Sequence, residues 1–435
     1  MSIADWSGVA AIYLPLAAAL VAGLLHWRQP RLFASCLLSL LWAVPSLVVV
    51  QALNVGAGWW SFGGDGVRFH GMPVECIVGW ALLWGAVPQL AFPRLRLGWV
   101  AAIMGAADLV LMPVCGALVH LGPRWLIGEV VAIFLVLAPA LLVARWTLEN
   151  TRLAARSALQ IATSGMLFLY FVPEVVFALR PGAGWTPLLK LPGWELQISV
   201  QAVLVLALPG VSAVMEFAQR GRGTPIPYDP PQRLVTSGVY RYCANPMQVS
   251  CAAVMLLWAG ILQNGWLVLA AAMAAIYSAG IARWDEAEDL SRRFGEPWHN
   301  YRAEVHDWGF RWRPYHAGPP ARVYIATTCG PCSELRAWLE RSDPLGLQIV
   351  AAETLSTGSI QRMRYVPEDG SSAVEGVRAM GRALEHINIG WAMAGAALRL
   401  PVVWQGVQLL MDASGLGPRS LASCGTTPTA SKLPG

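Results

Sequence analysis

Long apolar runs separated by short polar loops constrain the fold of this chain more than any other feature. About 20 consecutive apolar residues form a helix that crosses the hydrocarbon core of a bilayer. The chain has a mean hydropathy of +0.49 and only 13% charged residues, a composition typical of membrane proteins. We therefore predict a polytopic α-helical membrane protein. About nine spans are expected, near residues 8–26, 32–53, 73–92, 98–121, 125–144, 157–179, 195–218, 247–263 and 266–283.

Basic residues between these runs predict how the chain crosses the membrane, because cytoplasmic loops carry an excess of lysine and arginine. Alternate loops carry that excess, with Arg28, Arg31, Arg94, Arg96, Arg145, Arg152, Arg156, Arg220, Arg222, Arg233 and Arg241. The opposite loops hold Arg68, Arg124, Arg180 and Lys190. We expect the N-terminus outside and everything after Arg283 in the cytoplasm. The net charge of +5 follows from this topology, so no nucleic-acid partner is expected.

The membrane part of the chain divides into two predicted regions. Residues 1–156 hold five spans, to which the sequence assigns no role. Residues 157–313 hold four spans, a basic loop and a charged helix that ends at Gly295, where glycine is a common helix terminator.

A cytoplasmic domain is predicted beyond a linker at residues 314–320, which is rich in proline and glycine. The domain covers residues 321–420 and begins with a strand near 322–326, a helix near 331–341 and a strand near 347–352. This order is typical of a small α/β fold. The polar residues 421–435 predict a disordered tail.

Two separated motifs in the second membrane region carry the most information. The first is PIPYDPPQRLVTSGVYRYCANPMQ, from Pro225 to Gln248, and the second comprises Asp285-Glu286 and Leu290 to Gly295 after a two-span hairpin. Together they resemble the isoprenylcysteine carboxyl methyltransferase and phospholipid N-methyltransferase group. Its members pair a loop of the form PPxxLVTxGxYRYxRNPxY with EExxLxxxFGxxYxxY. The resemblance covers roughly residues 195–313 and implies S-adenosylmethionine as cofactor and a membrane lipid or another lipophilic molecule as acceptor.

The chemistry of the loop agrees with that implication. Pro230-Pro231 and Asn245-Pro246 cannot continue a helix, so the basic loop between them stays extended at the cytoplasmic face. S-adenosylmethionine carries a carboxylate, an ammonium, a ribose diol and a sulfonium, which call for a cation, a carboxylate and hydrogen-bonding side chains. The predicted cofactor-binding residues are Tyr240, Arg241, Asn245, Pro246, Met247, Gln248 and Glu286, and Arg241 is also a candidate catalytic residue. By resemblance, Glu286 takes the position of the family's first glutamate, and the two motifs close over the cofactor.

Four positions depart from the family pattern. Ala244 replaces the basic residue that is usual before Asn-Pro, and Gln248 replaces a tyrosine. Ser250 stands where the family often has glycine, and Ala287 replaces the second glutamate. These changes leave open an altered cofactor pose or a site that has lost its activity.

Acidic residues within or near the spans are a second group of candidates, because ionisable groups at that depth are costly. They are Asp108, Glu129, Glu174 and Glu216. For Glu216, close to Arg220, we expect a buried pair with an arginine or a side chain that reaches the membrane surface. Glu174 follows Pro173 in an apolar run, where a kink opens a polar pocket for a lipid head group, and it is the second candidate catalytic residue.

The cytoplasmic domain carries the motif Cys329-Gly-Pro-Cys332 after a predicted strand and at the start of a predicted helix. A helix N-terminus lowers the pKa of a thiol there and makes it reactive. The domain resembles the small thioredoxin-fold group named for its DxxCxxC signature, on this motif together with Asp369-Gly370 and Gly376. It departs at Ala326 and Thr327, where that group carries Asp-Gly. The motif is a redox pair with a thiol partner, half of a zinc site, or a remnant in a binding domain. We expect no metal, since no second CxxC or His pair follows.

Three functions remain open from the sequence. The first is methyl transfer from S-adenosylmethionine to a thiol, carboxylate or amine of a lipophilic or membrane-associated acceptor. Such an in-line displacement depends mostly on positioning and desolvation. The second is a membrane thiol-disulfide oxidoreductase that keeps an inactive methyltransferase scaffold. The third is a non-catalytic lipid-binding or transporter-like protein.

Overall fold

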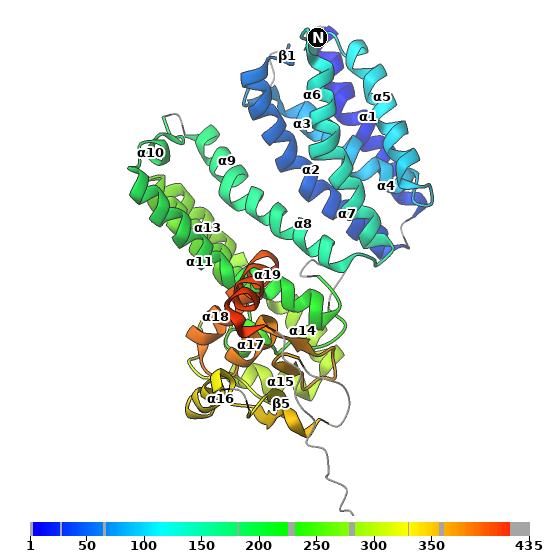
Figure 1. Ribbon diagram of the computed structural model, residues 1–435. Coiled ribbons are helices and arrows are strands. Elements are labelled where there is room, and N and C mark those ends of the chain that lie inside the picture. The colour runs from blue at the N-terminus through cyan, green and yellow to red at the C-terminus, as the bar shows by residue number, and fades with distance from the viewer. Residues whose placement is uncertain are drawn as a thin grey trace, which may run out of the picture. The chain divides into compact units, whose positions relative to one another are not determined.

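The computed structural model describes residues 3–26, 28–63, 67–180, 182–224, 231–277, 283–328, 330–355 and 361–417. It consists of two compact units whose segments alternate along the chain, and Figure 1 labels their elements. Unit 1 comprises Met1–Val200, Phe217–Arg233 and Ala252–Ala274. Unit 2 comprises Gln201–Glu216, Leu234–Cys251 and Ala275–Gly435.

Unit 1 is built from apolar helices, and its described residues include four π-helical segments. Its elements are α1 (Ile3–Leu25), α2 (Pro30–Ala57), α3 (Val74–Ala81), η1 (Leu82–Ala86), α4 (Val87–Ala91), α5 (Leu97–Val114), α6 (Trp125–Ala132), η2 (Ile133–Leu137), α7 (Ala138–Leu148), α8 (Leu153–Met166), η3 (Leu167–Phe171), α9 (Val172–Leu179), α10 (Thr186–Leu189) and η4 (Phe217–Gly221). Helices α11 (Gly193–Glu216), α12 (Pro246–Ile261) and α13 (Gly265–Tyr277) each contribute residues to both units.

Prolines explain two of the π-helical segments, η2 and η3. A proline inside a helix lacks the N–H that the carbonyl four residues earlier would accept, and its ring clashes with that carbonyl. Pro139 and Pro173 follow η2 and η3, and the residues four positions earlier, Leu135 and Leu169, lie within those segments. The indole N–H of Trp42 donates to the Leu135 carbonyl at 2.9 Å, and that of Trp258 donates to the Leu169 carbonyl at 3.0 Å. The carbonyls that proline leaves without a partner are thus satisfied inside the apolar unit.

Six helical stretches in the described part of the chain are long and apolar enough to cross a membrane. They are Arg31–Ala57, Val74–Ala91, Leu97–Val114, Trp125–Leu148, Leu153–Leu179 and Gly193–Gly221. They coincide with the second to seventh predicted spans. Shorter apolar helices at Val9–Leu25, Pro246–Ile261 and Gly265–Ile276 coincide with the first, eighth and ninth. The polytopic helical architecture is therefore present, and the count of nine spans remains a prediction, as do the orientation and the domain boundaries.

The core of unit 1 lies between α2, the continuous helix formed by α3 and η1, α5, and the helix formed by α6, η2 and α7. Buried residues from these elements include Leu47, Trp84, Met104 and Val136. Unit 1 also has two short two-stranded antiparallel sheets. In one, β1 (Trp60–Phe62) pairs with β4 (Val119–Leu121), and in the other, β2 (Arg68–Phe69) pairs with β3 (Met72–Pro73) as a hairpin.

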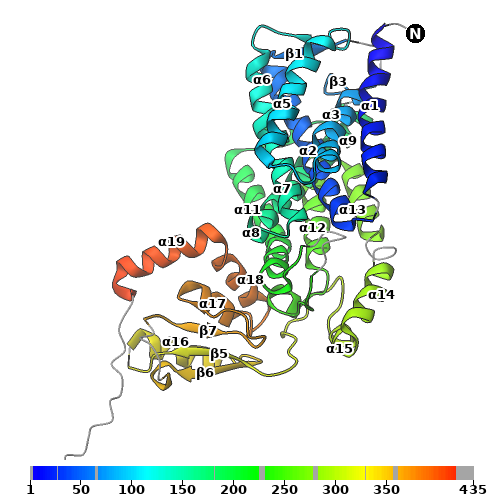
Figure 2. The same ribbon diagram turned by 90° about the vertical axis from the view of Figure 1, so that its right-hand side faces the viewer.

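Unit 2 contains a four-stranded mixed sheet. Its strands are β5 (Ala321–Ile325), β6 (Leu347–Ala351), β7 (Arg364–Val366) and β8 (Val374–Glu375), in the order β6-β5-β7-β8. Strands β5 and β6 are parallel, whereas the β5–β7 and β7–β8 pairs are antiparallel. Figure 2 shows β5, β6 and β7 running side by side. The predicted strand, helix and strand near residues 322–352 correspond to β5, α16 and β6.

The remaining elements of unit 2 are helical. They are η5 (Gly238–Arg241), α14 (Arg283–Phe294), α15 (Glu296–Glu304), α16 (Gly330–Arg341), η7 (Ala352–Thr354), α17 (Val377–Leu384), α18 (Ile389–Leu398), α19 (Pro401–Met411) and η8 (Asp412–Leu416). Leu339 of α16 and Ala383 of α17 pack with Val323 of β5 and Tyr365 of β7 in one buried cluster. The predicted tail at residues 421–435 lies outside the described residues.

Candidate functional site

Within the first motif, whose residues 225–230 lie outside the described residues, residues 237–243 form a buried turn in unit 2. Residues 237–243 are all buried and include the 3-10 helix η5. Gly238 begins η5 with a φ of +61°, a left-handed conformation that glycine adopts without cost. A Cβ atom at this position would lie 2.7 Å from the carboxyl carbon of Glu216. The glycine of the motif is therefore required both by the backbone and by the acid packed against it.

Glu216 at the end of α11 is the centre of a buried ion-pair network. Its Oε1 accepts from Arg382 Nη1 at 2.7 Å and from Arg399 Nη1 at 2.6 Å. Its Oε2 accepts from the Ser237 hydroxyl at 2.7 Å. Glu385 contacts the same two arginines, at 3.2 Å from Arg382 and 2.5 Å from Arg399. Two carboxylates and two guanidinium groups thus balance in charge where all four side chains are buried.

This network ties the motif turn to the helices that follow the sheet. Glu385 Oε2 accepts from the Gly238 N–H at 3.1 Å, and its backbone carbonyl accepts from the Tyr242 hydroxyl at 2.8 Å. Burial alone would lower the pKa of Arg382, but Glu216 and Glu385 outweigh burial and raise it, so this arginine stays charged. For Glu216, which is close to Arg220 in the sequence, we expected either a buried pair with an arginine or a side chain that reaches the membrane surface, and the structure shows a buried pair with arginines. The partners found here lie 166 and 183 residues along the chain.

Arg241, a predicted cofactor-binding and catalytic residue, is 2% exposed. Its Nη1 donates to the Tyr315 carbonyl at 3.1 Å, and its Nη2 forms an ion pair with Glu368. Burial works to lower the pKa of Arg241, and Glu368 and its neighbours raise it above the ordinary value. Both terminal nitrogens of the guanidinium therefore hold the turn. The Nε atom has no hydrogen-bond partner among the described residues.

Backbone contacts hold the same turn from the segment that precedes the sheet. The Tyr301 hydroxyl donates to the Tyr240 carbonyl at 2.8 Å, and the Tyr315 N–H donates to the Arg241 carbonyl at 2.8 Å. Tyr240 is buried. Residues 301–315 and the motif turn therefore form one packed substructure.

The last part of the motif leads into α12 and is more open. The Asn245 amide donates to Asp307 Oδ1 at 2.9 Å, and Asp307 is held in turn by Arg302 at 2.7 Å. Pro246 is buried as the first residue of α12, and Met247 and Gln248 are half-buried. The Oε1 atom of Gln248 is buried and has no hydrogen-bond partner among the described residues. It is an acceptor that a ligand can use.

Glu286 lies in α14, and its side chain is outside the described residues. Helix α14 belongs to unit 2, as does the motif segment Leu234–Cys251. The predicted cofactor-binding residues from both motifs are therefore parts of one compact unit, although they come from segments about 40 residues apart.

Glu174, the second candidate catalytic residue, is a buried residue of α9 in unit 1. Its Oε2 lies 2.5 Å from His70 Nε2, and its Oε1 accepts from the Trp185 indole N–H at 2.7 Å. Both carboxylate oxygens are occupied. Trp185 also stacks on Tyr170, with ring centroids 5.9 Å apart. These contacts give Glu174 a structural role in unit 1. Its catalytic role remains a prediction.

In the CxxC motif, Cys329 lies outside the described residues, and Cys332 is a half-buried residue of α16 that packs against the sheet core. A feature missed in the sequence lies beside the motif. Glu353 Oε1 accepts from the Thr327 N–H at 2.8 Å and the Thr328 N–H at 3.3 Å. Burial works to raise the pKa of Glu353, but these hydrogen bonds lower it. Glu353 thus places an acid beside the segment where Ala326 and Thr327 replace the expected Asp-Gly. In the sequence, the position of Glu353 just after β6 was the one signal that could have indicated this role.

Comparison with known proteins supports the assignment of the two motifs. A model of the phospholipid methyltransferase family matches residues 200–296, a range that includes the turn, the two following helices and α14. No curated protein and no solved structure matches the chain. The match and the apolar helices together support an integral membrane methyltransferase. The matched range is well under half of the chain.

Proposed function

We propose that the protein is an S-adenosylmethionine-dependent methyltransferase that acts on a lipophilic acceptor in the membrane. The observation that carries the proposal is the family match at residues 200–296. The match covers both motifs, and the predicted cofactor-binding residues of the two motifs belong to one compact unit. The acceptor is a membrane lipid or a lipid-like molecule, as the description of the matching family suggests. The basic loop and unit 2 lie on the cytoplasmic side in the predicted topology.

The chain's residues fit the chemistry of the cofactor. The unpartnered Oε1 of Gln248 can accept from an ammonium group or a ribose hydroxyl, and so can the carboxylate of Glu286. Asn245, with Tyr240, Pro246 and Met247 beside it in the motif, completes the proposed binding surface. When bound, S-adenosylmethionine supplies the electrophilic methyl group. The part of the protein is to hold donor and acceptor in line and to exclude water.

Arg241 serves this site best by holding the turn. Its side chain is buried and engaged by Glu368 and the Tyr315 carbonyl, so a direct contact with the cofactor would require it to give up those partners. We therefore propose Arg241 as a positioning residue of the cofactor loop. Glu174 stays a candidate for binding the acceptor's head group, for which it would have to release His70 or Trp185.

A second candidate function is thiol-disulfide exchange by the cytoplasmic domain. The observation that favours it is the order of elements: a strand, the CxxC at the start of α16, a parallel strand and an antiparallel pair, which a thioredoxin-like fold requires. Glu353 supplies an acid next to the motif. A protein or small-molecule thiol would be the partner.

The test is isothermal titration of the purified protein with S-adenosylhomocysteine. Wild-type protein is expected to bind, and Glu286→Ala and Asn245→Ala are expected to lose binding while remaining folded. Glu288→Ala is the matched control, because Glu288 is an exposed acid on the same helix. Absence of binding by a folded wild-type protein, or equal binding by all four proteins, would exclude the proposed site.

A further inference from the structure

Helix α19 of unit 2 presents apolar side chains to its surroundings. Its sequence, PVVWQGVQLLM, carries no charge. The exposed fractions of Val402, Leu409 and Leu410 are 81%, 69% and 71%. Gly406 is exposed as well, and nothing lies within 4 Å of the position that a Cβ atom would take there. These four residues occupy positions i, i+4, i+7 and i+8 and therefore share one face of the helix, which we call the apolar stripe.

The opposite face of α19 holds the helix to unit 2 through polar contacts. Gln408 Oε1 accepts from the Val377 N–H at 3.0 Å, and Gln408 Nε2 donates to Asp412 Oδ1 at 2.9 Å. Asp412 in turn forms an ion pair with Arg362 at 2.7 Å. A helix at the surface of a soluble domain has the reverse pattern, with apolar side chains packed inward and polar side chains in water. The pattern of α19 therefore indicates that its outer face meets an apolar partner.

An ion pair within unit 2 places the start of α19 near the end of a candidate membrane span. Residues Gln201–Glu216 of α11 belong to unit 2, and α11 is part of the apolar stretch Gly193–Gly221. Arg399 Nη1 donates to Oε1 of Glu216, the last residue of α11, at 2.6 Å. Pro401 begins α19 two residues after Arg399, so the Cα atoms of these two residues are at most about 7 Å apart.

The direction of the apolar stripe agrees with this position. Figure 2 shows α17 between α19 and the sheet, and α11 on the same side of the sheet as α19. Because Gln408 faces Val377 of α17, the stripe points away from the sheet. Leu204 and Val205 of the α11 segment are also exposed, as expected of a span in contact with lipid. Figure 2 also shows α19 running across the direction of α11, the orientation of a helix that lies along a bilayer surface.

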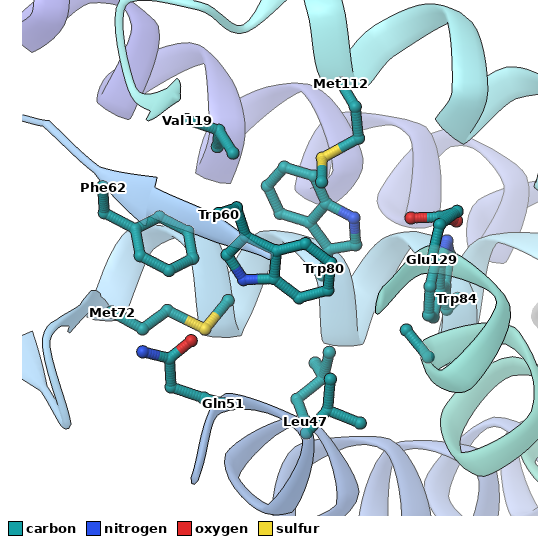
Figure 3. A pocket seen from close by; sticks show the side chains of 12 residues that line it. Leu47, Gln51, Trp60, Phe62, Met72, Trp80, Trp84, Met112, Val119 and Glu129 are labelled. Atoms are coloured by element: carbon teal, nitrogen blue, oxygen red, sulfur yellow. The ribbon is translucent and has the colours of Figure 1, made fainter. Parts of the chain in front are cut away.

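The cavity in unit 1 that Figure 3 shows is too small for a lipid. Glu129 lies on one side of it and Gln51 on the other, with Trp60 and Trp80 between them. Its volume is about 30 Å³, whereas a group of the size of water needs about 10–15 Å³. This cavity has room for about two such groups and not for an acyl chain. Outer faces of helices, such as the apolar stripe, are therefore better suited to contact lipid.

We propose that α19 is an interfacial helix whose apolar stripe is inserted into the surface of the bilayer beside α11. A helix of this kind buries its apolar face about 5–10 Å into the boundary between head groups and acyl chains. Since α19 has no charged side chain, the attraction is apolar, and the partner is a phospholipid surface whether or not its head groups are anionic. This contact holds unit 2 against the membrane, and it does not depend on methyl transfer.

The test is the fluorescence of a nitrobenzoxadiazole probe on the full-length protein in nanodiscs of phosphatidylcholine. The probe is attached to Val402→Cys and to Leu410→Cys, and the signal of wild-type protein treated in the same way is subtracted. Gln348→Cys is the matched control. Gln348 is an exposed residue of β6, which lies at the opposite edge of the sheet from β8, and α19 contacts Val377 just after β8.

Phosphatidylcholine that carries a nitroxide is expected to quench the probe at both stripe positions at least about threefold more strongly than at Gln348, because the stripe lies among the lipids. Such quenching, unchanged in about 1 M salt, supports the proposal, since salt screens charges and not apolar contacts. Quenching that is equal at stripe and control, or that disappears in high salt, would overturn it. Absence of quenching at the stripe in protein with unchanged circular dichroism would also overturn it, and a blue-shifted emission would then identify a protein surface as the cover.

Discussion

Replacing Glu216 with glutamine is expected to destabilise unit 2 more than any change of a surface acid. The substitution would keep the shape of the side chain but remove the charge that Arg382 and Arg399 contact at 2.7 and 2.6 Å. Both guanidinium groups would then depend on Glu385 in an interior where all four side chains are at least nine-tenths buried. Removing one partner from a buried ion pair costs about 3–5 kcal/mol.

The assay is thermal unfolding of the purified protein, followed by near-ultraviolet circular dichroism. For a domain of about 150–250 residues, 1 kcal/mol shifts the midpoint by about 2–4 °C, so Glu216→Gln should lower it by roughly 6–20 °C. Glu304→Gln is the control, since Glu304 pairs with Arg311 with its side chain 56% exposed and such pairs contribute at most about 1 kcal/mol. Equal shifts in the two variants would refute the reasoning.

A double variant separates charge balance from packing. In Glu216→Gln/Arg382→Met the remaining arginine, Arg399, still contacts Glu385 at 2.5 Å, so the interior again holds one acid and one base. We expect this protein to be more stable than Glu216→Gln alone, which would be a non-additive coupling between neighbours. Additive losses would show that the network is not held together by charge.

Three further predictions concern unit 2. Gly238→Ala should lower the free energy of unfolding by more than about 2 kcal/mol, because the φ of Gly238 is +61° and the new Cβ would clash with Glu216. A thermal unfolding midpoint equal to that of wild type would contradict the turn geometry. Burial lowers the pKa of His386 well below its ordinary value, so the folded state binds fewer protons than the unfolded one as pH falls below about 6.5. Unfolding midpoints should fall between pH 7.5 and 5.5 in wild type and less in His386→Gln, and parallel pH profiles would exclude His386 as the cause. Glu353→Gln should alter the rate at which Cys329 and Cys332 react with a disulfide probe, measured by mass spectrometry, while Glu334→Gln on the exposed face of α16 should not; equal rates in both would remove Glu353 from the thiol chemistry.

Local patterns in the sequence predicted the parts of the fold that depend on them. Apolar runs placed the helices of unit 1, and strand and helix signals at residues 322–352 coincide with β5, α16 and β6. The two motifs were assigned to one site, and the family match covers both. Each of these inferences uses residues that are neighbours along the chain.

Contacts between distant segments could not be predicted in this way. Arg382 and Arg399 belong to helices of the C-terminal domain, and nothing near them in the sequence indicates that Glu216 is their partner. Arg241 was read as a cofactor ligand because it stands in the motif, whereas its pairing with Glu368 depends on how residues 127 positions apart pack. Likewise, the proline positions were visible, but the indoles that satisfy the Leu135 and Leu169 carbonyls were not.

Transfer of a labelled methyl group to membrane lipid tests the central claim most directly. Membranes containing the protein are incubated with S-adenosylmethionine that carries a deuterated methyl group, and total lipids are then examined by mass spectrometry. Wild-type protein is expected to produce a lipid heavier by one labelled methyl group, Glu288→Ala the same lipid, and Asn245→Ala and Glu286→Ala none. Identical lipid spectra from wild type and from folded Asn245→Ala and Glu286→Ala proteins would contradict the account.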